Sequence, residues 1–236
     1  MTPRWTFVDF VVVVLGGLAG AFALGLAGSL IAQPNSELTL VVSIIGQYAG
    51  HLLAIWLIAR GRDLGAHSLG LDIITGDILY VGIGVVLQIV MVFLFAPLRN
   101  VLVPSGQNPQ EIADVLVQLS SPAARIAAVA GTTFIAPVTE ELIFRGVLLR
   151  SMIRSPRWLI LGVTALVWAL FHVLGVPTVG AGILVVSQIF LMGLVLGYLT
   201  LRHDRLGPAI FTHAGFNLLA AVVLLLPPGV LDRLGG

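Results

Sequence analysis

The stretch Pro137–Gly146 reads P-V-T-E-E-L-I-F-R-G and places two adjacent glutamates and an arginine inside a long apolar run. Mostly apolar residues flank it on both sides, over Ile126–Ala136 and Val147–Leu149. In a helix that crosses a membrane, one ionised side chain near the centre costs about 2.5–3.5 kcal/mol on insertion scales. Charges at that cost indicate a paired or functional site, and we expect the rest of the chain to form the bundle that surrounds it.

The composition is that of an integral membrane protein. The chain has 236 residues, of which 58% are hydrophobic and only 10% charged, and its mean hydropathy is +1.07. A soluble domain carries about 25% charged residues. The formal net charge of +1 suggests no nucleic-acid partner, and the absence of cysteine excludes disulfides and thiolate metal sites.

Seven apolar segments are candidates for membrane spans, each of which needs about 20 mostly apolar residues. The segments are Val8–Ile31, Leu38–Ile58, Ile78–Leu98, Ala123–Leu149, Trp158–Leu174, Gly182–Thr200 and Pro208–Leu226. We interpret the first as a retained span, because it is too long for the core of a signal peptide. The sequence therefore predicts an all-α, polytopic membrane helix bundle of about seven transmembrane helices, with one domain over residues 1–236 and the active site inside the bundle.

The segments between the spans predict the orientation. Residues 60–77 and 99–122 are polar loops, and Pro109–Leu119 has the apolar spacing of a helix that lies on the membrane surface. One set of alternate loops holds Arg4, Arg60, Arg62, Arg150, Arg154, Arg157, Arg202 and Arg205, and the other holds Arg99, Arg125 and Arg233. Because arginine favours the cytosolic side, the N-terminus is predicted in the cytosol and the C-terminus outside.

The fourth predicted span carries the charged motif at helical spacing. Glu141 precedes Arg145 by four residues, which is the favourable order for an ion pair along a helix. Glu140 is turned by about 100° from Glu141 and so faces elsewhere. Pro137 lacks a backbone N–H, and we expect it to open or bend the helix just before the two glutamates.

Two further spans carry polar pairs. Trp168 and His172 share a face of the fifth, and His213 and Asn217 share a face of the seventh. At about 1.5 Å per residue, Glu140, His213 and His172 lie roughly 15, 9 and 21 Å from the inner ends of their helices. These depths straddle the midplane without coinciding, so the three side chains meet only if a helix tilts or begins inside the cytosol.

Each of these residues also has a purely structural explanation. Glu141 and Arg145 can form an ion pair that only ties helices together, and a lone His172 or Asn217 can serve as an interhelical hydrogen-bonding group. Gln47 and His51, four apart on the second span, are assigned such a structural role. The occurrence of several such groups in one membrane domain favours a functional site over a set of separate structural contacts.

The three motifs, E-E-x-x-x-R, aromatic-x-x-x-H and H-x-x-x-N in that order, resemble the CAAX protease and bacteriocin-processing (Abi) family of intramembrane endopeptidases, related to the Ras-converting CAAX endopeptidase. The matching residues are Glu140, Glu141, Arg145, Trp168, His172, His213 and Asn217, and the resemblance covers a protease-like core of about residues 123–226. This chain departs from the family at Trp168, where the family usually has Phe, and it lacks an additional span of the eukaryotic enzyme.

The resemblance implies hydrolysis of a peptide bond in a membrane-associated protein or peptide, of the CAAX or leader-peptide type, by a water that a glutamate activates. The candidate catalytic residues are Glu140, Glu141, Arg145, His172, His213 and Asn217, with Trp168 and Phe144 in the substrate pocket. We assign Glu140 as the general base with the help of His172. His213 and Asn217 are assigned as donors to the oxyanion that forms when water attacks.

Other functions and another chemistry remain open on the sequence alone. A transporter with an intramembrane polar site would show repeat symmetry between halves, which this sequence lacks, and a catalytically silent immunity or scaffold protein of the same family is a third reading. A zinc site would use His172, His213 and Glu140. We prefer a metal-free site, because the histidines come from different helices without an H-E-x-x-H motif. The expected partners are a membrane-associated peptide substrate and the lipid bilayer of the cell membrane.

Overall fold

The computed structural model describes residues 5–32, 36–104, 109 and 122–225, and every regular element in these ranges is a helix. Eight α-helical segments, two 3-10 helices and two π-helical segments follow one another along this part of the chain. In order they are α1 (Phe7–Ile31), α2 (Glu37–Gly61), η1 (Ala66–Leu69), η2 (Thr75–Leu79), α3 (Tyr80–Leu102), α5 (Pro122–Ala130), η3 (Gly131–Ile135), α6 (Ala136–Glu141), η4 (Leu142–Leu149), α7 (Arg157–Phe171), α8 (Val179–His203) and α9 (Gly207–Leu225).

The predicted class of fold, a polytopic helix bundle, is confirmed. Five described helices are long and apolar enough to cross a membrane: Phe7–Ile31, Glu37–Gly61, Thr75–Leu102, Arg125–Leu149 and Val179–His203. Two shorter apolar helices, Arg157–Phe171 and Gly207–Val222, correspond to the fifth and seventh predicted spans. Because lipid offers no hydrogen-bonding partners, a chain of this composition satisfies its backbone within helices. We conclude that this is a multi-pass membrane protein.

Several boundaries differ from the prediction for local reasons. The fifth helix ends at Phe171 rather than Leu174, because His172 is its C-cap and Gly175 has a φ of 77° that continues no helix. Arg99 lies in the last turn of α3 instead of in a loop. The predicted polar loop 60–77 contains η1 and the start of η2. The predicted surface segment Pro109–Leu119 falls almost entirely outside the described residues.

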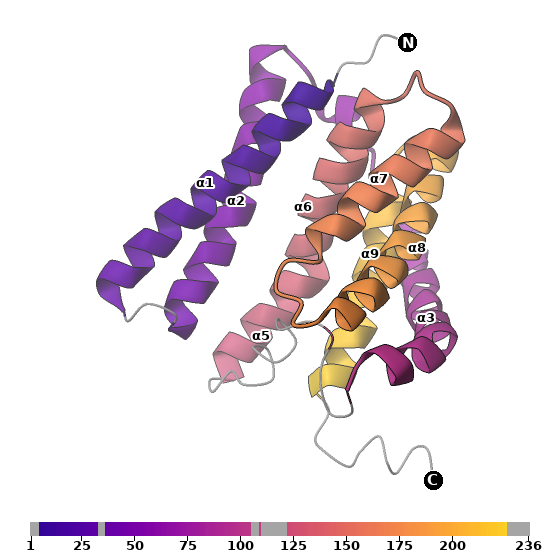
Figure 1. The fold of residues 1–236 in the computed structure, drawn as a ribbon. Coiled ribbons are helices and arrows are strands. Elements are labelled where there is room, and N and C mark those ends of the chain that lie inside the picture. Colours follow the sequence, from indigo (N-terminus) through magenta and orange to yellow (C-terminus); the bar gives the residue numbers. More distant parts are fainter. Residues whose placement is uncertain (1–4, 33–35, 105–108, 110–121, 226–236) are drawn as a thin grey trace.

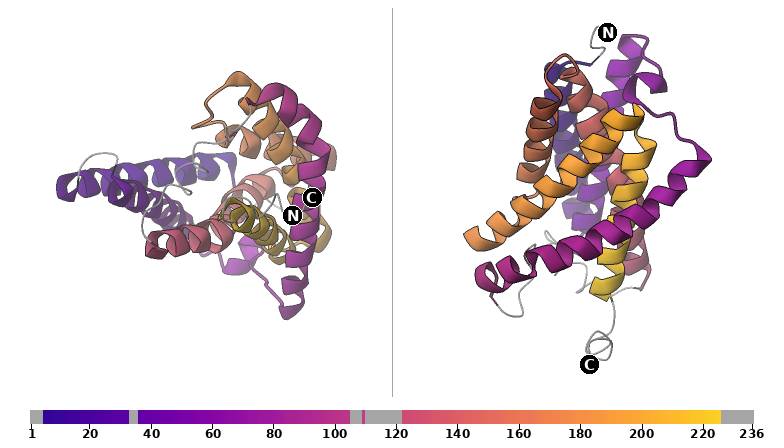
Figure 2. Two further views of the ribbon diagram at one scale, coloured as in Figure 1. Left: turned by 90° about the horizontal axis from the view of Figure 1, so that it is seen from below. Right: turned by 90° about the vertical axis from the view of Figure 1, so that its right-hand side faces the viewer.

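Helices α1 and α2 form an antiparallel hairpin that diverges from the remaining helices (Figure 1; Figure 2, left). Thr6 and Asp9 form a capping box at the start of α1, and the Ser36 hydroxyl accepts a hydrogen bond from the Thr39 N–H at the start of α2. On the other side of the molecule, α3 packs along α9 and α7 packs along α8. The helix formed by α5, η3, α6 and η4 lies between the hairpin and these pairs (Figure 1).

One end of the bundle is fixed by contacts between loops. Arg62 makes a bidentate ion pair with buried Asp9, with N–O distances of 2.7 and 2.6 Å. Arg205 pairs with buried Asp77, and the Leu206 N–H donates to the Gly70 carbonyl at 2.7 Å. These contacts connect the segment between α2 and α3 both to α1 and to the turn between α8 and α9. They therefore help to fix the position of α9 along the central helix.

The central helix changes its hydrogen-bonding pattern twice, in the π-helical segments η3 and η4. In η3 the Ala136 N–H bonds to the Gly131 carbonyl, five residues back. The next bond of this series would join Pro137 to Thr132, and Pro137 has no N–H to donate. The Thr132 carbonyl instead accepts a hydrogen bond from Asn217 Nδ2 of α9 at 2.9 Å. Pro137 thus alters the helix just before the glutamates, as predicted, and frees a carbonyl that anchors α9.

Candidate active site

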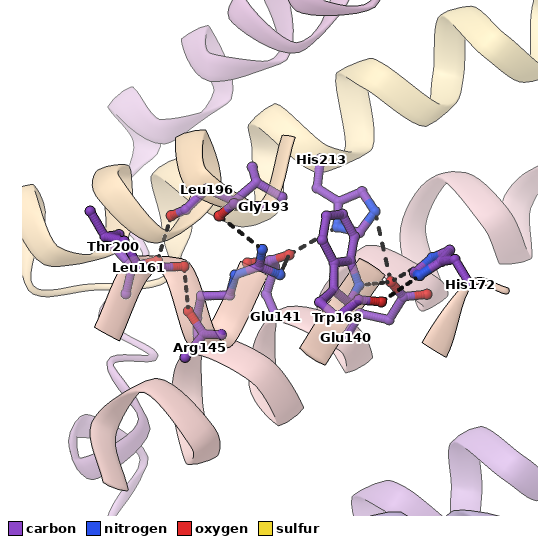
Figure 3. Close-up of polar contacts among 11 residues, drawn as sticks. Glu140, Glu141, Arg145, Leu161, Trp168, His172, Gly193, Leu196, Thr200 and His213 are labelled. Carbon is purple, nitrogen blue, oxygen red and sulfur yellow. Dashed lines mark hydrogen bonds and ion pairs between the residues drawn. The ribbon is translucent and has the colours of Figure 1, made fainter. Parts of the chain in front are cut away.

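Four elements bring the candidate residues together (Figure 3). The central helix supplies the two glutamates of α6 and Arg145 of η4, α7 supplies Trp168 and its C-cap His172, and α9 supplies His213. Helix α8 contributes a backbone carbonyl at Gly193. The convergence requires that α7 is short and runs obliquely to the central helix, as Figure 1 shows, so that its C-cap residue His172 reaches Glu140. The unequal depths inferred from the sequence are reconciled in this way.

A fully buried ion pair lies behind the site. Arg145 Nη1 donates to Glu141 Oε1 at 2.9 Å, and both side chains are wholly inaccessible. Arg145 Nη2 donates to the Gly193 carbonyl at 3.2 Å, and the guanidinium lies 4.5 Å from the centre of the Trp168 ring. The ion pair, the carbonyl and the aromatic face together compensate a charge that would otherwise be costly in a low-dielectric interior.

His213 is oriented by the same glutamate. Its Nδ1 lies 2.9 Å from Glu141 Oε1, the oxygen that also accepts from Arg145. An ionised carboxylate can only accept, so the proton of this hydrogen bond belongs to Nδ1. The Nε2 atom of His213 then faces the other glutamate, 4.0 Å from Glu140 Oε2.

His172 is oriented by a backbone carbonyl. Its Nδ1 lies 2.9 Å from the Trp168 carbonyl oxygen, four residues earlier. A carbonyl accepts and does not donate, so Nδ1 carries the proton and Nε2 is free for chemistry. This Nε2 lies 3.8 Å from Glu140 Oε2. Both imidazoles therefore present Nε2 to the same carboxylate oxygen.

Glu140 is the acid that is open to the outside. Its side chain is 21% exposed and that of His172 is 25% exposed, whereas His213 is 3% exposed. Glu140 Oε2 accepts a hydrogen bond of 2.8 Å from Trp168 Nε1. A partly accessible carboxylate between two oriented imidazoles can hold a water molecule and take a proton from it, which is the geometry that general base catalysis requires.

The remaining predicted residues lie next to this centre. Asn217 is one turn from His213, but its amide bonds to Thr132 of the central helix rather than to a group of the site. Phe144 is buried one turn after Glu140, and its ring packs against Phe10 and Phe171 at centroid distances of 5.8 and 5.5 Å. The role of Phe144 in a substrate pocket remains a prediction, as do the catalytic roles of the other residues.

Sequence reasoning missed two contacts at the site. It assigned Trp168 to the pocket wall, whereas the indole N–H is a hydrogen-bond donor to Glu140. It gave no role to Gly193, where a Cβ atom would lie 2.9 Å from that of Ala165 and 3.2 Å from the Trp168 ring. Two features of the sequence could have indicated these contacts. A tryptophan indole has one hydrogen-bond donor, and a glycine occurs both at Gly193 and four residues later at Gly197, the spacing at which helices can pack closely.

Glu140, His172 and His213 are the chemical types that bind zinc. Within the described part of the chain, however, no group of three or more His, Asp or Glu side chains is spaced to hold a metal. The side-chain positions as they stand therefore give no support for the alternative zinc site.

The fold and the site define a class of protein: a multi-pass helical membrane protein with an accessible glutamate and two oriented histidines beside a buried ion pair. Residues 122–219 match the family model described as "Type II CAAX prenyl endopeptidase Rce1-like". This match covers 98 of the 236 residues, less than half of the chain, and it supports for this segment the family predicted from the motifs. All seven motif residues lie inside the matched segment, and α1 to α3 lie outside it. No curated protein and no solved structure matches the chain.

Proposed function

We propose that the chain is an intramembrane endopeptidase that hydrolyses a peptide bond in a membrane-associated protein or peptide. The observation that carries this proposal is the position of Glu140 Oε2, which faces Nε2 of His172 at 3.8 Å and Nε2 of His213 at 4.0 Å. A purely structural ion pair would not need an accessible second glutamate with two oriented imidazoles around it. The matched family supports a CAAX type of activity.

In the proposed mechanism, Glu140 is the general base. A water bound beside Glu140 and His172 gives one proton to the Glu140 carboxylate while its oxygen bonds to the carbonyl carbon of the peptide. The proton then passes from Glu140 to the leaving nitrogen as the carbon–nitrogen bond breaks, leaving a carboxylic acid and an amine. His172 accepts a hydrogen bond from the water through Nε2 and so orients it.

His213 and Asn217 are proposed to stabilise the oxyanion. In this role His213 donates to Glu141 through Nδ1, at 2.9 Å, and to the oxyanion through a proton on Nε2. Asn217 Nδ2 has two hydrogens, and only one is needed for the hydrogen bond to Thr132. The buried Arg145 neutralises Glu141, which keeps that carboxylate out of the proton transfer.

The proposed substrate approaches from the membrane, so the peptide and the lipid bilayer are the proposed partners. We place the protein in the cell membrane with its N-terminus in the cytosol, because arginine is concentrated in that set of loops. The family description names prenyl endopeptidases, which makes a prenylated C-terminal CAAX peptide the first probe to use.

Turnover of peptides by purified protein tests the proposal. The protein in detergent is incubated with a farnesylated CAAX peptide and, separately, with a library of peptides from membrane proteins, and products are identified by mass spectrometry. Cleavage is expected for the wild type, and Glu140→Ala and His172→Ala should abolish it. Asn217→Ala should retain measurable activity, since one oxyanion donor is worth about 10²–10³ in rate. His67→Ala, an exposed histidine paired with Asp72, is the matched control.

Two outcomes would contradict the proposal. Absence of turnover of both sets of peptides would favour a silent immunity or scaffold protein or a transporter. Full activity of Glu140→Gln would remove Glu140 as the base. A separate measurement decides the chemistry: stoichiometric zinc in active protein, with activity lost on chelation and restored by zinc, would replace the metal-free scheme by a zinc site at Glu140, His172 and His213.

A further inference from the structure

The Trp168 side chain contacts four other groups of the site, those of Glu140, Arg145, His172 and His213 (Figure 3). It is completely buried. Its ring packs edge to face against His172 and His213, at centroid distances of 5.0 and 5.3 Å. The Arg145 guanidinium lies over the same ring at 4.5 Å. A single tryptophan thereby connects the buried ion pair to both histidines.

The polar atoms of Trp168 act on the two groups that are open to the outside. Its Nε1 donates to Glu140 Oε2 at 2.8 Å, and its backbone carbonyl accepts from His172 Nδ1 at 2.9 Å. Within the described part of the chain, the Trp168 hydrogen bond is the one that the Glu140 carboxylate receives. The Nε2 atoms of His172 and His213 lie 3.8 and 4.0 Å from Glu140 Oε2, beyond hydrogen-bonding distance.

The orientation of Glu140 therefore depends on one donor. A free glutamate side chain samples several rotamers, and holding it in one of them has an entropic cost. A short bond to a carboxylate is charge-assisted and roughly twice as strong as a neutral one. The donor itself cannot move, because the Trp168 ring is held by Arg145, by the two imidazoles and by close packing against Gly193, where a Cβ would lie 3.2 Å from the ring.

We propose that Trp168 is a positioning residue whose indole N–H holds Glu140 Oε2 toward the Nε2 atoms of His172 and His213. This inference rests on the proposed function, because it gives Glu140 the task of accepting a proton. It assigns Trp168 a role beyond that of a pocket wall, which any aromatic ring could fill. A phenyl ring at this position has no donor, so Glu140 would lose its one hydrogen bond while most of the packing remained.

Two variants separate the N–H from the ring. In one, Trp168 is replaced by 3-benzothienylalanine, which keeps the shape of the indole and has sulfur in place of the N–H. In the other, Trp168→Phe removes both the N–H and part of the ring. Trp158→Phe is the matched control, since Trp158 lies on the same helix with 74% of its surface exposed. Kinetics are measured with the peptide that the wild type cleaves.

The expected result is a loss in kcat with little change in KM. Misplacing a reacting group by about 1 Å can cost up to about 100-fold in rate, so we expect a fall of 10- to 100-fold for both Trp168 variants and no change for Trp158→Phe. A wild-type kcat in the benzothienyl variant would overturn the proposal. A loss of thermal stability without a loss of kcat would show that Trp168 only packs.

A measurement that needs no turnover tests the hydrogen bond itself. In protein labelled with ¹⁵N-tryptophan, the Trp168 indole N–H signal is assigned by its absence in Trp168→Phe. We expect it downfield of the other indole signals and protected from solvent exchange, and we expect both properties to be lost in Glu140→Ala. If the signal is insensitive to Glu140, the positioning role is wrong even in an active enzyme. If the wild type cleaves no peptide, the proposed function fails first, and the positioning role falls with it whatever this signal shows.

Discussion

At the scale of single residues, the site is built on one shared carboxylate oxygen. Glu141 Oε1 accepts from Arg145 at 2.9 Å and from His213 at 2.9 Å, and the side chains of all three residues are buried. Glu141 Oε2 and Arg145 Nε are buried with no partner in the described part of the chain. Few contacts therefore hold the Glu141–Arg145 ion pair, and removal of one side chain leaves the other as an unpaired buried charge.

Arg145→Ala is expected to lower both the amount of folded protein and its activity. The change leaves Glu141 as an unpaired buried charge and frees the Gly193 carbonyl, and breaking a buried ion pair costs roughly 3–5 kcal/mol. Thermal unfolding in detergent and membrane yield measure the effect. Arg154→Ala, at an exposed position in the following turn, should change neither. Unchanged stability of Arg145→Ala would mean that the ion pair makes no net contribution to the fold.

At the scale of elements, α1 and α2 form a hairpin held by backbone contact. A Cβ at Gly46 would lie 2.2 Å from the Gly20 carbonyl oxygen, and a Cβ at Gly50 would lie 2.2 Å from that of Gly16. The two helices approach so closely because glycine occupies both sides of the crossing, as the Gly16-x-x-x-Gly20 spacing suggests. In membranes such packing replaces the hydrophobic effect as the force that joins helices.

Gly46→Ala should destabilise this hairpin. The added methyl group meets a backbone oxygen, which cannot turn aside as a side chain does, and overpacking of this kind costs about 1–3 kcal/mol. Gly82→Ala in α3 is the matched control, because nothing lies within 4 Å of a Cβ at that position. There the same change should be neutral or stabilising by about 0.5–1 kcal/mol. Equal melting temperatures for the two variants would contradict the role of Gly46.

At the scale of the whole molecule, most of the described arginines outside the site belong to segments at one end. The α2–α3 segment with Arg62, the turn after η4 with Arg150, and the α8–α9 turn with Arg205 all lie at the end where α1 begins (Figure 1). Arg150 Nη1 reaches Asp204 at 3.2 Å and Arg205 pairs with Asp77, so the ion pairs join these segments to one another. The described helices thus place the predicted cytosolic segments on a common face.

Single-cysteine labelling tests this orientation, since the chain has no cysteine of its own. Arg154→Cys lies at the arginine-rich end, and an impermeant thiol reagent should label it only after the membrane is permeabilised. Ser36→Cys, at the start of α2 and the opposite end, should be labelled in intact cells. Labelling of Arg154→Cys from outside would invert the predicted topology and leave the bundle itself unaffected.

The sequence by itself determined the features that depend on local spacing. Apolar runs predicted the helices because backbone groups in lipid must bond within their own segment. The four-residue interval between Glu141 and Arg145 predicted their ion pair, since residues at that spacing are neighbours on any helix. Pro137 predicted a break in the regular helix for an equally local reason, the missing N–H. The motifs predicted the family for the same segment of the chain.

Only the tertiary structure decided how the motif residues meet. The contacts from Trp168 to Glu140, His213 to Glu141 and Asn217 to Thr132 join residues 28, 72 and 85 positions apart. Whether such groups face each other depends on the tilt, rotation and length of each helix, and these are set by packing against neighbouring helices rather than by spacing along the chain. Because α7 ends at Phe171 and runs obliquely, the imidazole of its C-cap His172 reaches Glu140.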